Sequence, residues 1–178
     1  GYIKKTVSGD VMNIKKVSVD KEGTGMGWGA VYAQYLESMD QIGEQGNGLS
    51  VSRQLYKGDE ALNESVPLKV GDKITVRLTV KADRDMDFVQ IKDDRAACME
   101  PLQAVSGFRW GNGLGYYQAT KDASTQFFID QMRKGTYVIE YQVYVNRTGE
   151  YQAGIATVQS AYAPEFGGHT RGYRVMVE

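Results

Sequence analysis

The clearest pattern in this chain is the alternation of apolar and polar residues in its second half. Every second residue from Ile74 to Val80 is apolar, which predicts a half-buried strand after the turn at 70–73. The same alternation occurs over 88–92 and, at greater length, over 136–145. The pattern therefore predicts strands, since a helix would repeat its apolar positions every three to four residues.

Further strands are predicted on both sides of this region. Residues 136–145 are followed by the turn Thr148-Gly149-Glu150 and by a second alternating stretch over 151–161, which predicts a β-hairpin. Met12–Val19 and Leu49–Tyr56 also have the composition and alternation of strands. We expect all these strands to be antiparallel, because the connections between them are short.

The segment from Ala30 to Ile42 fits two periodicities. Tyr32, Tyr35, Leu36 and Met39 lie at helical spacing, whereas alternate residues from Trp28 to Leu36 would share one face of a strand. Glycine is a poor start for a helix, and several glycines precede this segment. We expect a strand through about Glu37, then one helical turn over 37–42.

These elements predict an all-β fold, an antiparallel β-sandwich of the immunoglobulin-like type with extra N-terminal strands. The chain has 178 residues, including 21 glycines, many of them at turn positions between short strands. The polar stretch 57–66 precedes a proline and marks a candidate boundary. We expect residues 1–60 to hold N-terminal strands, a remnant of a preceding domain, and residues 61–178 to form the sandwich.

Composition narrows the classes of protein that the chain can belong to. A net charge of −1 argues against a nucleic-acid-binding protein, which needs a basic surface to neutralise phosphates. Cys98 is the single cysteine, so no disulfide forms within the chain. The sequence contains no apolar run long enough to span a bilayer, so we expect no membrane contact by this fragment. It shows no signal peptide either, which says nothing about where the parent protein is located. We interpret the chain as a C-terminal piece of a longer protein.

Candidate catalytic residues are few. His169 is the only histidine and lies in a glycine-rich loop, and Cys98 lies in an apolar stretch. A nucleophile–base pair would have to use both or to use His169 with a serine. We interpret His169 as a surface residue and Cys98 as a buried free thiol, and we predict no catalytic site.

A cluster of aspartates resembles the start of a calcium-binding loop. Asp83, Asp85 and Asp87 alternate, and Asp94 follows, but Phe88 occupies the position where a calcium loop needs glycine. We interpret the cluster as a solvated turn with Arg84 and Arg95 as local counter-charges. We predict no metal site and no cofactor.

The glycines at 111, 113 and 115 predict a hairpin rather than a phosphate loop, because no helix follows them. Trp110, Tyr116 and Tyr117 flank this turn and are candidates for an aromatic platform that binds a sugar or a protein. The alternative is that these rings belong to the core and to strand faces, as is common in sandwiches.

The order of motifs from about residue 66 to 178 resembles the C-terminal macroglobulin-like domain of bacterial alpha-2-macroglobulins. The matching motifs are Val70-Gly71-Asp72-Lys73, Asp83 to Val89, Asp94-Arg95-Ala96, Glu100-Pro101, Ser106 to Trp110, Gly115-Tyr116-Tyr117, Asp122 to Asp130, Lys134 to Tyr137, and Tyr162 to Phe166. The segment 48–56 resembles the strand that leads into this domain, and residues 1–47 match less clearly. Each motif is short, and the specificity lies in their order.

The resemblance implies a function for the parent protein. Members of the family are large protease-trapping inhibitors of endopeptidases in the bacterial periplasm or cell envelope, and many are lipid-anchored lipoproteins. The resemblance implies that this domain docks on sister domains, including a thioester domain, and that target proteases are reached through the parent. It also implies that Tyr162, within Tyr162-Ala163-Pro164-Glu165-Phe166, shields a thioester from water.

Two alternatives stay open at this stage. Tyr162 could simply pack beside Pro164, which ends a strand. The chain could also be a cell-surface adhesion or carbohydrate-binding β-sandwich module, which predicts an exposed aromatic row near Trp110 and Tyr116. The chain itself has no thioester motif, because Cys98-Met99-Glu100-Pro101 has proline where glutamine is needed.

Overall fold

The computed structural model describes residues 2–9, 13–32 and 34–178, and it divides into two compact units, Gly1–Leu36 and Glu37–Glu178. The polar stretch 57–66, where we expected a boundary, lies inside the second unit and contains a short strand. No helix among the described residues is long and apolar enough to cross a membrane.

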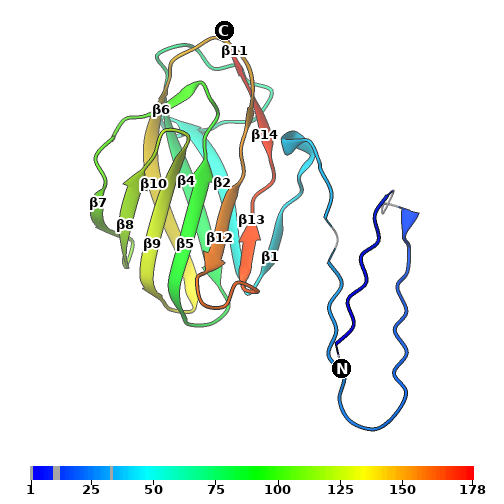
Figure 1. Cartoon of the computed structure of the whole chain (residues 1–178). Coiled ribbons are helices and arrows are strands. Elements are labelled where there is room, and N and C mark those ends of the chain that lie inside the picture. The colour runs from blue at the N-terminus through cyan, green and yellow to red at the C-terminus, as the bar shows by residue number, and fades with distance from the viewer. Residues whose placement is uncertain (1, 10–12, 33) are drawn as a thin grey trace. The chain divides into compact units, whose positions relative to one another are not determined.

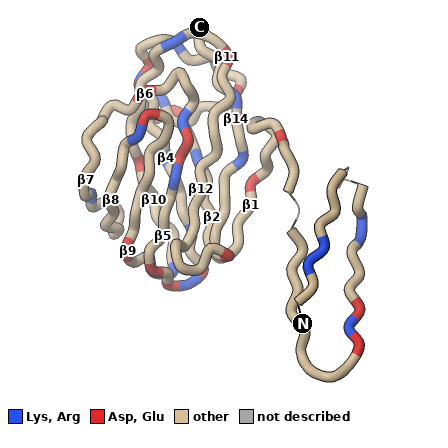
Figure 2. Tube along the Cα trace, in the orientation of Figure 1, with Lys and Arg blue, Asp and Glu red and all other residues tan. Residues whose placement is uncertain are grey.

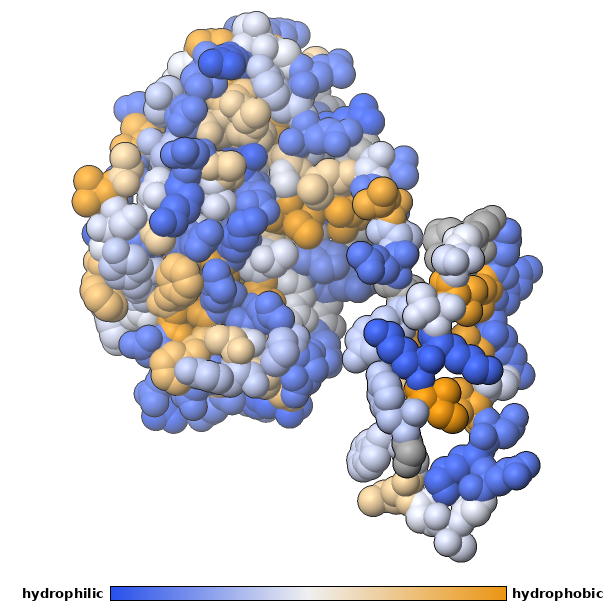
Figure 3. All heavy atoms as spheres, in the orientation of Figure 1, coloured by the Kyte–Doolittle hydropathy of each residue, from blue (hydrophilic) through white to orange (hydrophobic). Residues whose placement is uncertain are grey.

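The described residues of the first unit form no strand, and hydrophobic side chains lie at its surface (Figure 3). The strand that we predicted over 12–19 is therefore absent from its described part, 13–19, while Met12 lies outside the described residues. The strand predicted from Trp28 to Glu37 is also wrong where the structure describes it. Alternation gives a segment one apolar face, but a strand also needs a neighbouring strand to accept and donate its backbone hydrogen bonds.

The second unit is an antiparallel β-sandwich, as predicted (Figure 1). The helical turn expected over 37–42 is present as the 3₁₀ turn η2, Met39–Gln41. The strands that follow are β1 Gln45–Asn47, β2 Leu49–Lys57, β3 Glu60–Ala61, β4 Lys73–Ala82, β5 Met86–Asp94, β6 Met99–Pro101, β7 Gly107–Gly111, β8 Leu114–Thr120, β9 Ser124–Met132, β10 Gly135–Val145, β11 Gly149–Ala153, β12 Ala156–Ser160, β13 Gly167–His169 and β14 Tyr173–Val177.

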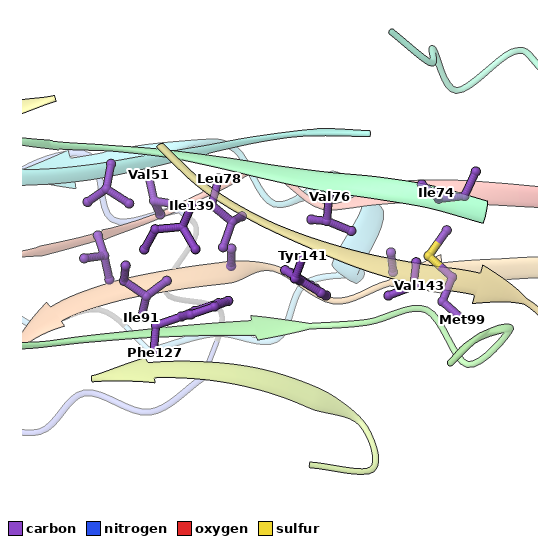
Figure 4. Packing of buried hydrophobic residues seen from close by; sticks show 14 of the residues in the cluster. Val51, Ile74, Val76, Leu78, Ile91, Met99, Phe127, Ile139, Tyr141 and Val143 are labelled. Carbon is purple, nitrogen blue, oxygen red and sulfur yellow. The ribbon is translucent and has the colours of Figure 1, made fainter. Parts of the chain in front are cut away.

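Pairing joins most of these strands in one path that folds into two layers. The order is β6-β10-β4-β2-β1-β13-β12-β5-β9-β8-β7, with β3 beside β2, and β11 pairs with β14 separately. Side chains from both layers meet in the core, where Ile91 and Phe127 lie opposite Leu78 and Ile139 (Figure 4). The alternation predicted for 74–80 and 136–145 is confirmed, because their odd or even sets are buried as expected.

The hairpin predicted between 136–145 and 151–161 is wrong. β10 pairs with β4 and β6, so both of its edges are occupied within the described sheet. The stretch 151–161 is divided between two strands, of which β11 pairs with β14 and β12 pairs with β5 and β13. Alternation and a turn residue locate strands, but the choice of partner depends on the burial of residues distant in sequence.

One charged pair is buried in the sandwich. The Arg53 guanidinium forms a salt bridge with Asp93, donates to the carbonyl of Gly154 at 2.5 Å, and lies 4.4 Å from the centre of the Tyr173 ring. The Tyr141 hydroxyl donates to the second oxygen of Asp93 at 2.9 Å. Burial raises the pKa of Tyr173 to about 12, because the charged phenolate is disfavoured away from water. We call Arg53, Asp93, Tyr141 and Tyr173 the buried polar cluster.

Candidate functional site

Tyr162 stands at the tip of the loop that connects β12 to β13. Its side chain is 80% exposed, although it follows a strand whose alternate residues are buried. Its ring meets the Phe88 ring edge to face, with the centroids 5.1 Å apart. The loop therefore carries a large aromatic group that is supported on one side and open to solvent on the other.

Phe88, the neighbour of Tyr162, has an unusual backbone. Its φ is +52°, a conformation in which a bulky side chain is strained. The Ala161 amide donates to the Phe88 carbonyl at 2.9 Å, which ties this point of β5 to the residue before Tyr162. The sequence shows Phe88 inside an alternating strand but gives no sign of this conformation, so the partnership with Tyr162 could not be predicted.

The rest of the loop is braced by hydrogen bonds from several segments. The Phe166 amide donates to Ala163, and the Ser160 amide donates to the Phe166 carbonyl. The Asn47 side chain donates to the Glu165 carbonyl at 2.7 Å, and Gln159 donates to the Pro164 carbonyl at 3.3 Å. Pro164 and Glu165 thus contribute main-chain acceptors that hold the loop. Conformational freedom removed in this way does not have to be lost again on binding.

The ring of Phe166 anchors the loop to the sandwich. It lies so close to Gly48, whose φ is +68°, that a Cβ atom there would be 2.6 Å from the ring. The Arg84 guanidinium lies 4.7 Å from the centre of the same ring. The loop is therefore fixed at Phe166 and exposed at Tyr162.

The three predicted platform residues do not share one face. Trp110 is 79% exposed, and Tyr117 lies on the outer face with it. Tyr116 points toward the core, where its ring packs edge to face on Phe127 with the centroids 5.6 Å apart. Phe108 was not among the predicted platform residues, but it lies on the outer face in place of Tyr116. Its ring meets the Tyr117 ring edge to face, with the centroids 5.2 Å apart. Alternation about the hairpin turn would have found it, since Phe108 and Trp110 are two residues apart.

The two candidate catalytic residues, Cys98 and His169, do not form a catalytic arrangement in the structure. Cys98 is a buried free thiol, as predicted, and burial raises its pKa, which opposes formation of the thiolate. His169 belongs to the short strand β13 rather than to a loop, and its Nδ1 lies 3.1 Å from the Thr170 carbonyl oxygen. Within the described part of the chain, the contact of His169 is to a backbone carbonyl and Cys98 is a buried free thiol, so neither forms a nucleophile–base pair.

The aspartates form separate ion pairs rather than one site. Asp83 pairs with Arg84, which lowers its pKa, and Asp85 pairs with Arg133 at 3.4 Å. Among the described residues, no three His, Cys, Asp or Glu side chains gather as metal ligands. Arg95 is not a counter-charge for this turn. It is buried and donates to the Thr125 hydroxyl and to the Asp122 carbonyl, both at 2.7 Å.

Comparison with known proteins gives matches that cover most of the chain. A curated relative, circularly permutated Ras protein 2 of Dictyostelium discoideum, is 26% identical in an alignment of 166 residues that covers 89% of this chain and 4% of that protein. The structure of Salmonella alpha-2-macroglobulin reacted with methylamine matches with a TM-score of 0.65 and 19% identity, covering 76% of this chain and 10% of that one. Escherichia coli alpha-2-macroglobulin activated by porcine elastase matches with a TM-score of 0.66 and 16% identity, covering 77% and 14%.

The matched region also identifies the family. The chain spans only a small fraction of the length of these relatives. The model of the bacterial alpha-2-macroglobulin MG10 domain matches residues 48–165, about two thirds of the chain, from β2 to β12. This chain therefore belongs to the family of bacterial alpha-2-macroglobulin MG10 domains.

Proposed function

We propose that this chain is a non-catalytic domain of a large protease-trapping inhibitor, and that it docks on a sister domain of its parent through Tyr162. The observation that carries the proposal is an 80% exposed tyrosine on a loop that five hydrogen bonds, from the Ala161, Phe166, Ser160, Asn47 and Gln159 donors, hold in place. An exposed tyrosine on a mobile loop is ordinary, whereas one on a braced loop is preorganised for a partner.

The shielding role follows from the chemistry of a thioester. Water attacks such an acyl group, so a protein that stores one must exclude water until it is needed. The Tyr162 ring is flat, mostly apolar and 80% exposed, so it can cover a group of that size while its contact with Phe88 supports it. Support also comes from the matched proteins, one of which was reacted with methylamine, an amine nucleophile, and another activated by elastase.

The remaining parts of the proposal rest on the family. We place the parent in the periplasm or cell envelope, held there by a lipid anchor, and we assign protease capture to the parent rather than to this domain. No enzymatic role is proposed, because the Cys98 thiol is buried and the ionisation of that thiol is disfavoured.

The test is the affinity of this chain for the thioester-domain region of its parent. Wild type is compared with Tyr162→Ala, with Tyr162→Phe, which keeps the ring, and with Tyr144→Ala, which removes a partly exposed tyrosine from β10. We expect Tyr162→Ala to weaken binding at least tenfold, about 1.4 kcal/mol, while the other two variants stay near wild type. Equal affinity of all four proteins would overturn the docking role.

Shielding is tested separately in the full parent protein. If Tyr162 covers a thioester, Tyr162→Ala accelerates the reaction of the intact parent with methylamine before any protease is added. Tyr162→Phe should react at the wild-type rate, since the ring rather than the hydroxyl excludes water. An unchanged rate in Tyr162→Ala would show that another group protects the thioester.

A further inference from the structure

The outer face of β7, β8 and β9 carries a row of exposed aromatic rings. The register pairs Phe108 with Tyr117 and Tyr117 with Phe128, so the three rings stand side by side across three strands. Neighbouring strands are about 4.8 Å apart, so the row is about 10 Å long. Phe108 is 77% exposed and lies on β7, the last strand of the described sheet. We call Phe108, Trp110, Tyr117 and Phe128 the aromatic row.

Trp110 lies flat against the neighbouring strand. It pairs with Gly115, and a Cβ atom at Gly115 would be 2.8 Å from two carbons of the indole ring. The glycine therefore makes room for one face of the indole, while the side chain stays largely exposed. A large ring laid over a glycine on a paired strand is held in orientation by that contact. The result is a flat aromatic surface open to solvent.

The line of rings continues as a line of amides. Phe128 pairs with Gln90, Gln90 pairs with Gln159, and Gln159 pairs with Gly167, all on the same outer face. Gln90 and Gln159 are exposed. None of the side chains along this line is charged, and the nearest charges on the same face are Lys92 and Asp130, each two residues away along its strand. The traces of β7 and β8, which carry the other rings, are mostly tan in Figure 2. Each amide can both donate and accept hydrogen bonds.

A shallow trough lies at the far end of this line. It has a volume of about 590 Å³ and is lined by Gln45, Asn47, Gln159 and His169 beside the glycines at 46, 167 and 168. The register places these polar side chains on the same face as the amides, since Gln45 pairs with His169 and Asn47 with Gly167. The face therefore passes from aromatic rings, through amides, to a polar hollow.

We propose that this face binds an uncharged oligosaccharide chain of β-linked sugars with equatorial substituents. Such a sugar ring has two apolar faces made of C–H groups, which pack on aromatic rings, and a rim of hydroxyl groups. Each hydroxyl both donates and accepts, and an uncharged amide offers it a donor and an acceptor at once, without the cost of desolvating a charge. A protein partner would also use the rings, but the uncharged line of amides beside them fits the rim of a sugar chain better.

The binding test uses this chain and three soluble hexasaccharides. The probes are β-1,4-linked glucose, β-1,4-linked N-acetylglucosamine and, as a control of different shape, α-1,4-linked glucose. The chain has two tryptophans, so Trp28→Phe leaves Trp110 as the only fluorescent indole. We expect a β-linked hexasaccharide to shift Trp110 emission to shorter wavelength, with a much weaker effect of the α-linked one. The double variant, Trp28→Phe with Trp110→Ala, should bind the β-linked hexasaccharide at least tenfold more weakly than Trp28→Phe alone. Its affinity is measured by calorimetry.

Two further variants separate this site from the docking loop. Gln90→Ala should weaken sugar binding severalfold, whereas Tyr162→Ala should leave it unchanged, because Tyr162 lies on the β12–β13 loop. No binding of either β-linked hexasaccharide would overturn the proposal. So would binding that survives Trp110→Ala, or a loss of affinity for the thioester-domain region in Trp110→Ala without any sugar binding, which would assign the aromatic row to a sister domain.

Discussion

The buried polar cluster and the Tyr162 loop reverse the usual distribution of side chains in opposite ways. The first places a guanidinium and a carboxylate inside the sandwich, and the second places an aromatic ring in water. Each is braced by contacts between segments distant in sequence, such as Arg53 with Gly154 and Asn47 with Glu165. The difference is that the first makes its charged contacts inside the sandwich, whereas the Tyr162 ring stays largely exposed. We therefore expect the cluster to determine stability and the loop to determine binding.

The largest effect is expected from breaking the buried pair. Asp93→Ala leaves the Arg53 charge buried without its partner, which should lower the free energy of unfolding by about 3–5 kcal/mol. Urea denaturation followed by circular dichroism measures the loss. The matched control is Glu140→Ala, which breaks the exposed pair with Arg77 and should have a much smaller effect. Equal losses in the two variants would contradict the special role of the cluster.

The cluster also predicts a decline of stability at alkaline pH. A tyrosine in the unfolded chain ionises near pH 10, whereas burial raises the pKa of Tyr173 to about 12 in the folded chain. Between these values the unfolded state binds fewer protons, so stability is complete below pH 10 and falls as pH rises toward 12, by about 2–3 kcal/mol. Tyr173→Phe keeps a ring beside Arg53 and should make this decline shallower when unfolding is followed across the pH range. Burial also raises the pKa of Tyr141, so part of the decline should remain. The same slope in both proteins would assign the effect elsewhere.

A substitution at Gly48 should disturb the anchor of the loop. Gly48→Ala combines a strained positive φ with a clash against the Phe166 ring, which together should cost about 2–3 kcal/mol. Gly58→Ala is the matched control, because φ there is +61° but no atom lies within 4 Å of the added Cβ. Thermal unfolding compares the two. If Gly48→Ala and Gly58→Ala lose the same stability, the close packing of Phe166 on Gly48 contributes nothing to the loss.

The smallest effect on stability is expected at Tyr162 itself. Tyr162→Ala removes one edge-to-face contact with Phe88 and little buried area, so the free energy of unfolding should change by about 1 kcal/mol or less. The same urea titration measures it beside the affinity for the thioester-domain region. A loss as large as that of Asp93→Ala would make Tyr162 a structural residue and would remove the contrast between the two regions.

Local pattern was enough to locate most strands of the sandwich. The alternation over 74–80 and 136–145 gave the buried faces correctly, and the glycine turn gave the β7–β8 hairpin. Pattern failed where a strand needs a partner, as in the described residues 13–19, and where two partners compete, as for β10. For the site, local pattern pointed to Trp110 and Tyr117, and the family resemblance pointed to Tyr162. Phe88, Phe108 and Phe128 were missed.

The sequence by itself determined the family, the fold class and the buried face of the long strands, because these depend on residue order and on a period of two. The tertiary structure alone decided that β12 pairs with β5 and that Phe88 supports Tyr162. It also decided that Tyr116 turns inward while Tyr117 turns outward beside Phe108. These outcomes depend on which strands share the core. That choice is made by the free energy of burying all their apolar faces together, which no local segment contains.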